Sequence, residues 1–114
     1  MVETSDGTSN LPATFDRGVS IKTERFYTYI LFSYKDKGLY IGFTTELKER
    51  LKLHASGKVT ATKHRRPFKL IHYEYFVNKK DAKAREEYLK SGFGRGQLKK
   101  ALGRTLIAFG YKDL

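Results

Sequence analysis

The chain of 114 residues is strongly basic, with 23 lysines and arginines against 12 acidic residues and a formal net charge of +11. An apolar share of 39% can fill the core of one domain, and the lack of cysteine excludes disulfides, thiolate zinc sites and thiol catalysis. No secretion signal or membrane-spanning apolar run is visible. We therefore expect an intracellular, cytoplasmic protein without a membrane partner, with the nucleoid or nucleus as open alternatives.

The first 24 residues differ from the rest in composition. They are rich in Ser, Thr, Gly, Asp and Asn, so we expect a flexible leader over 1–24 and one folded domain over 25–114. The leader holds 2 basic and 4 acidic residues, which leaves 23 − 2 = 21 basic and 12 − 4 = 8 acidic residues, or 21 − 8 = +13, for the domain. Charge alone does not separate DNA from RNA or an acidic membrane, but a surplus of this size favours a nucleic acid.

A β-hairpin is predicted at the start of the domain. Residues 26–33 (FYTYILFS) are aromatic and β-branched, and the polar turn YKDKG separates them from a second run, LYIGF, at 39–43. A helix is predicted over about 45–56, because a pair of threonines can cap its first turn and Gly57 can end it.

The second half of the domain is predicted to add one strand and two helices. A basic loop at 58–67 leads into a long aromatic, strand-like run at 68–77. Asn78 can cap a helix that continues to about Lys90, and apolar residues at helical spacing predict a last helix over about 96–109. The predicted order is β-β-α-β-α-α, which is an α/β (α+β) domain.

Polar side chains occupy positions where the helical pattern requires apolar ones. In the first predicted helix, Arg50 and His54 lie on the same stripe as the leucines, and in the second Glu86 lies on the apolar face while Glu87 points away. Each of these residues also has an ordinary structural explanation. In that explanation Arg50 extends to the surface, His54 is a buried, hydrogen-bonded histidine, and Glu86 forms a salt bridge to Arg85 or Arg50.

The hairpin directs hydroxyl groups toward the same interior. Tyr27 and Tyr29 share one face of the first strand, and Tyr40 shares a face with Gly42 in the second. The bare backbone at Gly42 is suited to close approach by a bulky ligand, although a glycine at a strand end is more often a bend. Arginine, histidine, tyrosine and carboxylate groups together suit phosphoryl chemistry, in which arginine neutralises phosphate, a carboxylate holds a hard cation, and tyrosine or histidine orients or deprotonates water.

These residues, taken in order, resemble the GIY-YIG nuclease family, in particular its small stand-alone members, and are similar to the N-terminal nuclease domain of the excinuclease C subunit. YIG at 40–42 is the second family tripeptide, and YTY at 27–29 is an altered first one. Arg50 and Glu86 match the family arginine and glutamate, and His54 follows the arginine by one helical turn, as in many members. The segments TKHRRPFKLIHYE and REEYLKSGFGR are also similar to those small members.

The resemblance implies a central three-stranded antiparallel sheet flanked by helices. It also implies a metal-dependent endonuclease that hydrolyses phosphodiester bonds in DNA, with structured or single-stranded DNA of repair or recombination as candidate substrates. One divalent ion, Mg²⁺ or Mn²⁺, would be bound by Glu86, with Arg50 on the scissile phosphate. Tyr29, Tyr40 and His54 would lie near the nucleophile, and each is a candidate general base.

The basic loop and the start of the third strand are expected to contact nucleic acid through Lys58, Lys63, His64, Arg65, Arg66 and Lys69. Phe43 stands where excision-repair relatives carry a lysine, so a mechanism that needs that lysine cannot operate here. Larger family members carry additional DNA-binding domains, so specificity is expected here from the loop, a protein partner or nucleic-acid shape.

Two alternatives to a DNA endonuclease stay open. One is a module for DNA or RNA that keeps the scaffold but cleaves little or not at all. The other is an RNA-associated protein that stacks bases on aromatic side chains, namely Tyr27, Tyr29, Phe43 and Tyr73. The presence of Tyr40, Arg50, His54 and Glu86 together argues against both, because binding alone requires positive charge but no inward carboxylate.

Overall fold

A computed structural model describes residues 24–114, so the predicted leader over 1–24 lies outside the described residues apart from its last position. The centre of the domain is a three-stranded antiparallel sheet with the spatial order β2-β1-β3. Its strands are β1 (Phe26–Ser33), β2 (Leu39–Thr44) and β3 (Phe68–Phe76). The fold class predicted from the sequence is confirmed, and the first strand has the predicted bounds.

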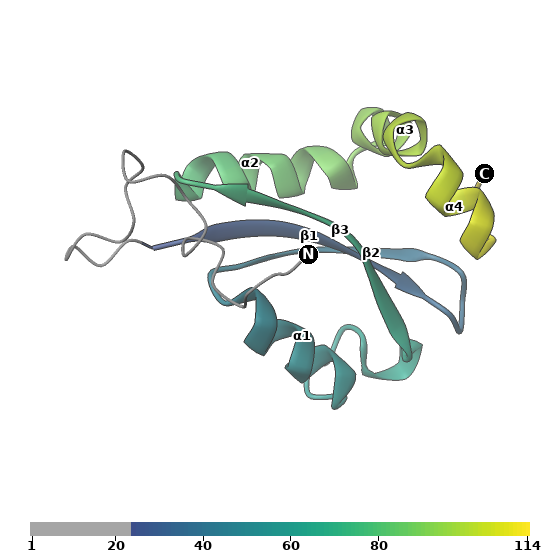
Figure 1. Cartoon of the computed structure of the whole chain (residues 1–114), viewed down its shortest axis with the longest axis horizontal. Coiled ribbons are helices and arrows are strands. Elements are labelled where there is room, and N and C mark those ends of the chain that lie inside the picture. Colours follow the sequence, from purple (N-terminus) through teal and green to yellow (C-terminus); the bar gives the residue numbers. More distant parts are fainter. Residues whose placement is uncertain (1–23) are drawn as a thin grey trace, which may run out of the picture.

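The helices lie on both sides of the sheet. Helix α1 (Leu47–Ala55) lies on one side, and α2 (Lys79–Lys90), which leads into α3 (Gly92–Ala101) and α4 (Gly103–Phe109), lies on the other (Figure 1). A short 3₁₀ turn, η2 (Lys63–Arg65), interrupts the basic loop before β3. None of the helices within residues 24–114 has the length and apolar character needed to cross a bilayer.

The apolar core occupies the sheet face that is covered by α2, α3 and α4. It is built from alternate residues of β1 and β2 and from the inward faces of the helices, namely Ile30, Phe32, Leu39, Ile41, Leu89, Leu98, Leu106 and Tyr111. In β1 the residues between these point to the opposite face, where α1 packs, because successive side chains of a strand alternate. The sheet therefore has one face for stability and one on which polar groups gather.

Helix boundaries on the core side follow from side-chain caps. The Asn78 carboxamide oxygen accepts hydrogen bonds from the backbone N–H groups of Lys80 (2.8 Å) and Asp81 (3.2 Å), which starts α2 as predicted. The Ser91 hydroxyl accepts from the Gly94 N–H (3.1 Å) and starts α3. Gly94 is required there, because a Cβ would lie 1.8 Å from the Tyr88 carbonyl oxygen.

The prediction of one helix over about 96–109 is wrong, since two helices occupy this part of the chain. The cap at Ser91 moves the start forward to Gly92, so the GFGRG segment begins a helix. The helical conformation then breaks at Leu102, whose φ of −114° and ψ of 23° are followed by a glycine. Apolar spacing continues through this break, which is why periodicity alone did not detect it.

Candidate active site

Tyr29 in the central strand is fully buried, and its ring lies over the backbone of Gly42 in the neighbouring strand. A Cβ atom on Gly42 would lie 2.5 Å from both Cζ and Oη of Tyr29, so only glycine permits this arrangement. The hypothesis that the bare backbone receives a bulky ligand is therefore wrong, because the tyrosine ring fills the space. The close approach directs the Tyr29 hydroxyl toward α1.

A line of buried polar groups continues from Tyr29. Its Oη lies 2.8 Å from Nε2 of His54, and Nδ1 of the same ring lies 2.8 Å from Oγ1 of Thr62. His54 is 2% exposed and Thr62 is fully buried. One arrangement of protons satisfies every group: Thr62 donates to the Val59 carbonyl (3.4 Å), His54 donates from Nδ1 to Thr62, and Tyr29 donates to Nε2.

Burial keeps this line uncharged. Burial, together with the positive charge of Arg50, lowers the pKa of His54 to about 4, so the imidazole is neutral at physiological pH. Burial also raises the pKa of Tyr29, against the opposing hydrogen bond from Arg50, and the negative charge of Glu86 contributes to the same increase. Tyr29 therefore remains a neutral phenol.

Arg50 and Tyr40 lie at the solvent side of this line of buried groups and form a polar cluster with Tyr29 and His54. Nε of Arg50 donates to the Tyr29 hydroxyl at 3.4 Å, and this bond, opposed by burial, raises the pKa of Arg50. Tyr40 acts on Arg50 in the same direction. The Tyr40 ring centroid lies 5.2 Å from His54 and 6.4 Å from Tyr29, but Tyr40 is only partly buried. Solvent can therefore reach Tyr40.

Glu86 of α2 acts on the cluster through its negative charge, which contributes to the raised pKa of Tyr29. It lies between the buried Ala82 and Leu89 as predicted, and its side chain is 16% exposed. Its partner is Lys90 at 2.9 Å, one helical turn away. The alternative explanation, a salt bridge from Glu86 to Arg85 or Arg50, is therefore wrong.

Arg85 binds Glu74 of β3 instead, through two hydrogen bonds of 3.0 and 3.1 Å. The neighbour of the candidate ligand, Glu87, is exposed, as the helical spacing indicates. In residues 24–114 there is no group of three or more histidine, cysteine or carboxylate side chains that could hold a metal ion. Glu86 is thus a single carboxylate donor.

A lone carboxylate still fits the ion that the sequence implies. Mg²⁺ commonly keeps several water molecules and binds through one or two carboxylates together with the phosphate oxygens of its substrate. Glu86 provides a hard oxygen donor with little exposure and a flexible lysine partner that can be displaced. The donor set of this chain is consistent with an ion that binds together with substrate.

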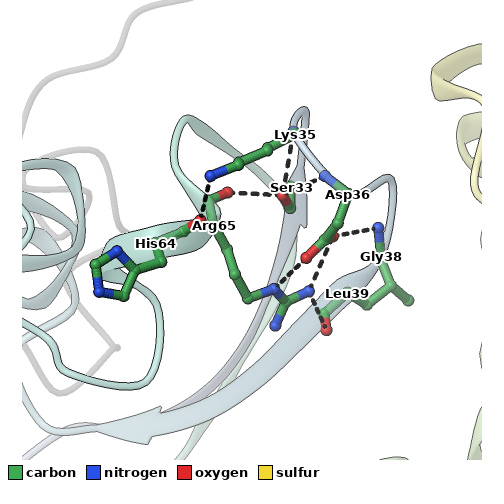
Figure 2. Close-up of polar contacts among 7 residues, drawn as sticks. All are labelled: Ser33, Lys35, Asp36, Gly38, Leu39, His64 and Arg65. Atoms are coloured by element: carbon green, nitrogen blue, oxygen red, sulfur yellow. Dashed lines mark hydrogen bonds and ion pairs between the residues drawn. The ribbon is translucent and has the colours of Figure 1, made fainter.

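The basic loop does not present all its cations to solvent. Arg65 is held by Asp36 of the β1–β2 turn through bonds of 2.5 and 3.2 Å, and it also donates to the Leu39 carbonyl at 3.2 Å (Figure 2). The Ser33 hydroxyl donates to the Arg65 carbonyl at 2.6 Å, and Lys35 donates to the His64 carbonyl at 3.0 Å (Figure 2). We call Ser33, Asp36 and Arg65 the hairpin clamp.

The clamp changes what Arg65 can contribute. Its guanidinium lowers the pKa of Asp36 to about 2, so the pair is ionic at physiological pH and the arginine charge is largely compensated. Arg66 also has a local role, because it donates to the carbonyls of Lys63 (2.9 Å) and Ala55 (3.4 Å). Both arginines shape the loop.

The remaining predicted nucleic-acid contacts differ in position. Lys69 pairs in register with Phe32, whose side chain lies in the core, so Lys69 is on the sheet face away from His54. Lys58, Lys63 and His64 are exposed, and none forms an ion pair with any residue that the structure describes. The two lysines, with the exposed Arg66, form the accessible positive charge of the loop.

Sequence reasoning missed Thr62, Ser33 and Asp36. Thr62 is buried inside a loop whose composition is polar and basic, so neither periodicity nor charge distinguishes it from its neighbours. Ser33 and Asp36 have the composition of an ordinary turn. Their role depends on Arg65, which is 29 residues after Asp36.

Comparison with known proteins agrees with the geometry. A model of the family described as "GIY-YIG catalytic domain" matches residues 25–100 of this chain. A UPF0213 protein of Clostridium perfringens is 45% identical over 65 residues, which cover 56% of this chain and 69% of that protein. A UPF0213 protein of Pediococcus acidilactici is 40% identical over 77 residues, which cover 65% of this chain and 78% of that protein. A UPF0213 protein of Streptococcus pyogenes is 41% identical over 76 residues, which cover 66% of this chain and 82% of that protein. No solved structure matches the chain significantly.

The sheet, the tyrosine pair on adjacent strands and the arginine that follows them on a helix define a nuclease-type catalytic domain. The chain belongs to the GIY-YIG family.

Proposed function

We propose that the protein is a metal-dependent endonuclease that hydrolyses phosphodiester bonds in DNA, with structured or single-stranded DNA as its substrate. The observation that carries the proposal is the position of Arg50, which binds the hydroxyl of a buried tyrosine and lies beside a second tyrosine that solvent can reach. Arginine, an accessible hydroxyl and a nearby carboxylate are the groups that phosphodiester hydrolysis needs.

Arg50 has the role of binding the reacting phosphate. Its pKa is raised by the hydrogen bond to Tyr29, so it remains charged at any physiological pH. Only Nε is used by Tyr29, and a guanidinium has five N–H donors, which leaves its outer edge for phosphate oxygens. The buried line of Tyr29 and His54 fixes the direction of this edge.

Tyr40 has the better position for contact with the attacking water. Tyr29 is fully buried and neutral, and His54, with a pKa of about 4, is a weak base at neutral pH. We therefore assign both to orientation of the site, and Tyr40, which is partly exposed, to contact with the nucleophile. Of the three candidate general bases, Tyr29, Tyr40 and His54, this assignment leaves Tyr40.

Glu86 has the role of holding Mg²⁺ or Mn²⁺. The bound ion supplies charge neutralisation to the phosphate during hydrolysis. Lys90 bonds to Oε2 of this carboxylate and is half exposed, so it can turn to solvent or to the phosphate backbone when an ion binds. Lys58 and Lys63 supply further positive charge for the DNA, so binding should weaken steeply with salt.

The experiment that tests the proposal is a cleavage assay on branched, single-stranded and duplex DNA and on RNA, with Mg²⁺, Mn²⁺ or a chelator. Wild type should cleave at least one DNA substrate only when the ion is present. Arg50→Ala should lower the rate on the order of 100-fold or more, because it removes a group that stabilises developing charge. Arg104→Ala, which removes an exposed arginine of α4, is the matched control and should leave the rate unchanged.

The proposal is wrong if no substrate shows cleavage that the chelator stops. Binding without such cleavage would favour the alternative of a nucleic-acid-binding module. Cleavage of RNA alone would replace DNA as the substrate class.

A further inference from the structure

Three tyrosines form an open aromatic surface on the sheet face that carries the candidate site. Tyr27 of β1 pairs in register with Tyr75 of β3, and the buried Tyr29 pairs with Tyr73. The ring centroid of Tyr27 lies 5.9 Å from that of Tyr73 and 5.8 Å from that of Tyr75. Tyr73 and Tyr75 are each 50% exposed. We call Tyr27, Tyr73 and Tyr75 the tyrosine surface.

This surface is open because Tyr29 leans away from it. The Tyr29 ring lies over Gly42 on the β2 side and bonds to His54 of α1, so the groups of the candidate site gather over β1 and β2. Tyr73 and Tyr75 are in β3, on the other side of the central strand. The half of the face formed by β1 and β3 therefore keeps its rings accessible.

The structure also separates these rings from aromatic residues that have structural partners. Phe43 stacks on Phe26 with centroids 6.4 Å apart, and Lys83 lies 4.9 Å above the Phe43 ring. Tyr29 is fully buried. Of the four aromatic side chains that the sequence suggested for base stacking, Tyr27 and Tyr73 are accessible to a base. Tyr75, which the sequence did not single out, is accessible as well.

We propose that the tyrosine surface binds unpaired bases of the strand whose phosphate is held by Arg50. The inference rests on the proposed function, since it assumes a nucleic-acid substrate. Accessible tyrosine rings on a sheet are suitable platforms for bases, and only unpaired bases expose a ring face to them. A net charge of 21 − 8 = +13 for residues 25–114 matches a polyanion.

The position of the surface gives it a purpose in cleavage. Tyr73 is the direct register partner of Tyr29, whose hydroxyl accepts from Arg50. The tyrosine surface therefore adjoins the candidate site on the same face of the sheet, and a base on Tyr73 would belong to the same strand as the reacting phosphate. Stacking there would favour strands that are single or locally opened, so the surface selects substrate structure without reading its sequence.

The test is a binding measurement in chelator, where no hydrolysis occurs. Fluorescence anisotropy compares a short thymidine oligonucleotide with an abasic oligonucleotide of equal length, which keeps the phosphates and lacks the bases. The variants are Tyr73→Leu with Tyr75→Leu, and Tyr73→Phe with Tyr75→Phe. Phe93→Leu is the matched control, because Phe93 is 87% exposed and belongs to α3, a helix on the other side of the sheet (Figure 1).

We expect the double leucine variant to bind the thymidine oligonucleotide on the order of tenfold more weakly, since stacking on an aromatic side chain contributes substantially for each base. Binding of the abasic oligonucleotide should not change. The double phenylalanine variant, which keeps both rings, and Phe93→Leu should bind as wild type does. Fluorescence of 2-aminopurine in the oligonucleotide should be quenched by wild type and not by the leucine variant.

Equal binding of both oligonucleotides by wild type, or unchanged binding by the leucine variant, would overturn the proposal. So would a change of oligomeric state in the leucine variant without a change in binding, because the surface would then join copies of the chain. If wild type binds the bases through the surface but never cleaves, the proposed function alone fails.

Discussion

The loop between α1 and β3 is held at two places by two different kinds of polar network. At Thr62 the network is buried and neutral, and it runs through His54 to Tyr29. At Arg65 the hairpin clamp is ionic and partly open, with side-chain exposures of 28% for Arg65 and 36% for Asp36. The first network ends at a tyrosine that binds Arg50, whereas the second ends at a turn with no candidate catalytic residue.

This difference separates the networks in function and in pH dependence. A buried network without charge holds the candidate site in one geometry, and it fails when His54 gains a proton. An ion pair at the surface contributes little to stability, and it fails only when Asp36 is neutralised. The two events occupy different pH ranges, so the networks can be broken one at a time.

The largest expected effect concerns His54 and acid. Its pKa falls from 6.5 in the unfolded chain to about 4 in the folded protein, so between these values the unfolded chain binds a proton that the folded protein does not. The stabilisation is complete above pH 6.5 and is lost as the pH falls toward 4. Between pH 7.5 and 5 the free energy of unfolding, measured by urea denaturation, should drop on the order of 2 kcal/mol.

Two histidine variants provide the control for this measurement. His64→Asn changes an exposed histidine and should keep the full pH dependence. His54→Asn should remove most of it. A His54 resonance that titrates near 6.5 by NMR would show that the network is not neutral and buried as described.

The next effect concerns the contact that places Tyr29. Gly42→Ala puts a Cβ atom 2.5 Å from the Tyr29 ring, so the ring must move away from His54. We expect a loss of about 1–3 kcal/mol in stability together with loss of cleavage. Gly96→Ala is the control, because nothing lies within 4 Å of that position in α3, and it should stabilise the protein by about 0.5–1 kcal/mol. Full activity in Gly42→Ala would separate Tyr29 from the site.

The smallest effect concerns the hairpin clamp. Asp36→Asn removes the charge that compensates Arg65. Because both groups are partly exposed, we expect the free energy of unfolding, measured by thermal denaturation, to fall by at most about 1 kcal/mol. The stability from this pair is present above pH 3.8 and is lost as the pH falls toward 2, below the range of His54. The cleavage rate should remain close to that of wild type.

Glu49→Gln breaks an exposed ion pair with Lys52 and should have no measurable effect, which calibrates the clamp measurement. A collapse of cleavage in Asp36→Asn with the fold intact would mean that the clamp serves the site directly.

Most of the fold was predictable because local signals agree with tertiary structure. The aromatic and β-branched runs became strands, and the Asn78 cap and the left-handed Gly57, with φ of 78°, mark helix ends where the sequence places them. The break at Leu102 was not predictable from apolar spacing, since the spacing continues through it.

The candidate site was predictable only in part, for a physical reason. Strand alternation and helical spacing correctly placed Tyr29, Arg50, His54 and Glu86 on inward faces. Partners were not predictable, because the pairing of His54 with Thr62 or of Glu86 with Lys90 depends on how elements and rotamers meet. The ion pair between Arg65 and Asp36 was not predictable either, because a count of charged residues treats the Arg65 charge as available to bind nucleic acid.

The most direct test of the central claim measures cleavage and binding together in Glu86→Ala and Glu87→Ala. The two glutamates are neighbours on α2, and each change removes one negative charge, but Glu87 is exposed, whereas Glu86 is largely buried and its charge acts on Tyr29. We predict that Glu86→Ala binds DNA as tightly as wild type or more tightly and no longer cleaves it in Mg²⁺ or Mn²⁺, while Glu87→Ala cleaves normally. Cleavage by Glu86→Ala at the wild-type rate would contradict the account.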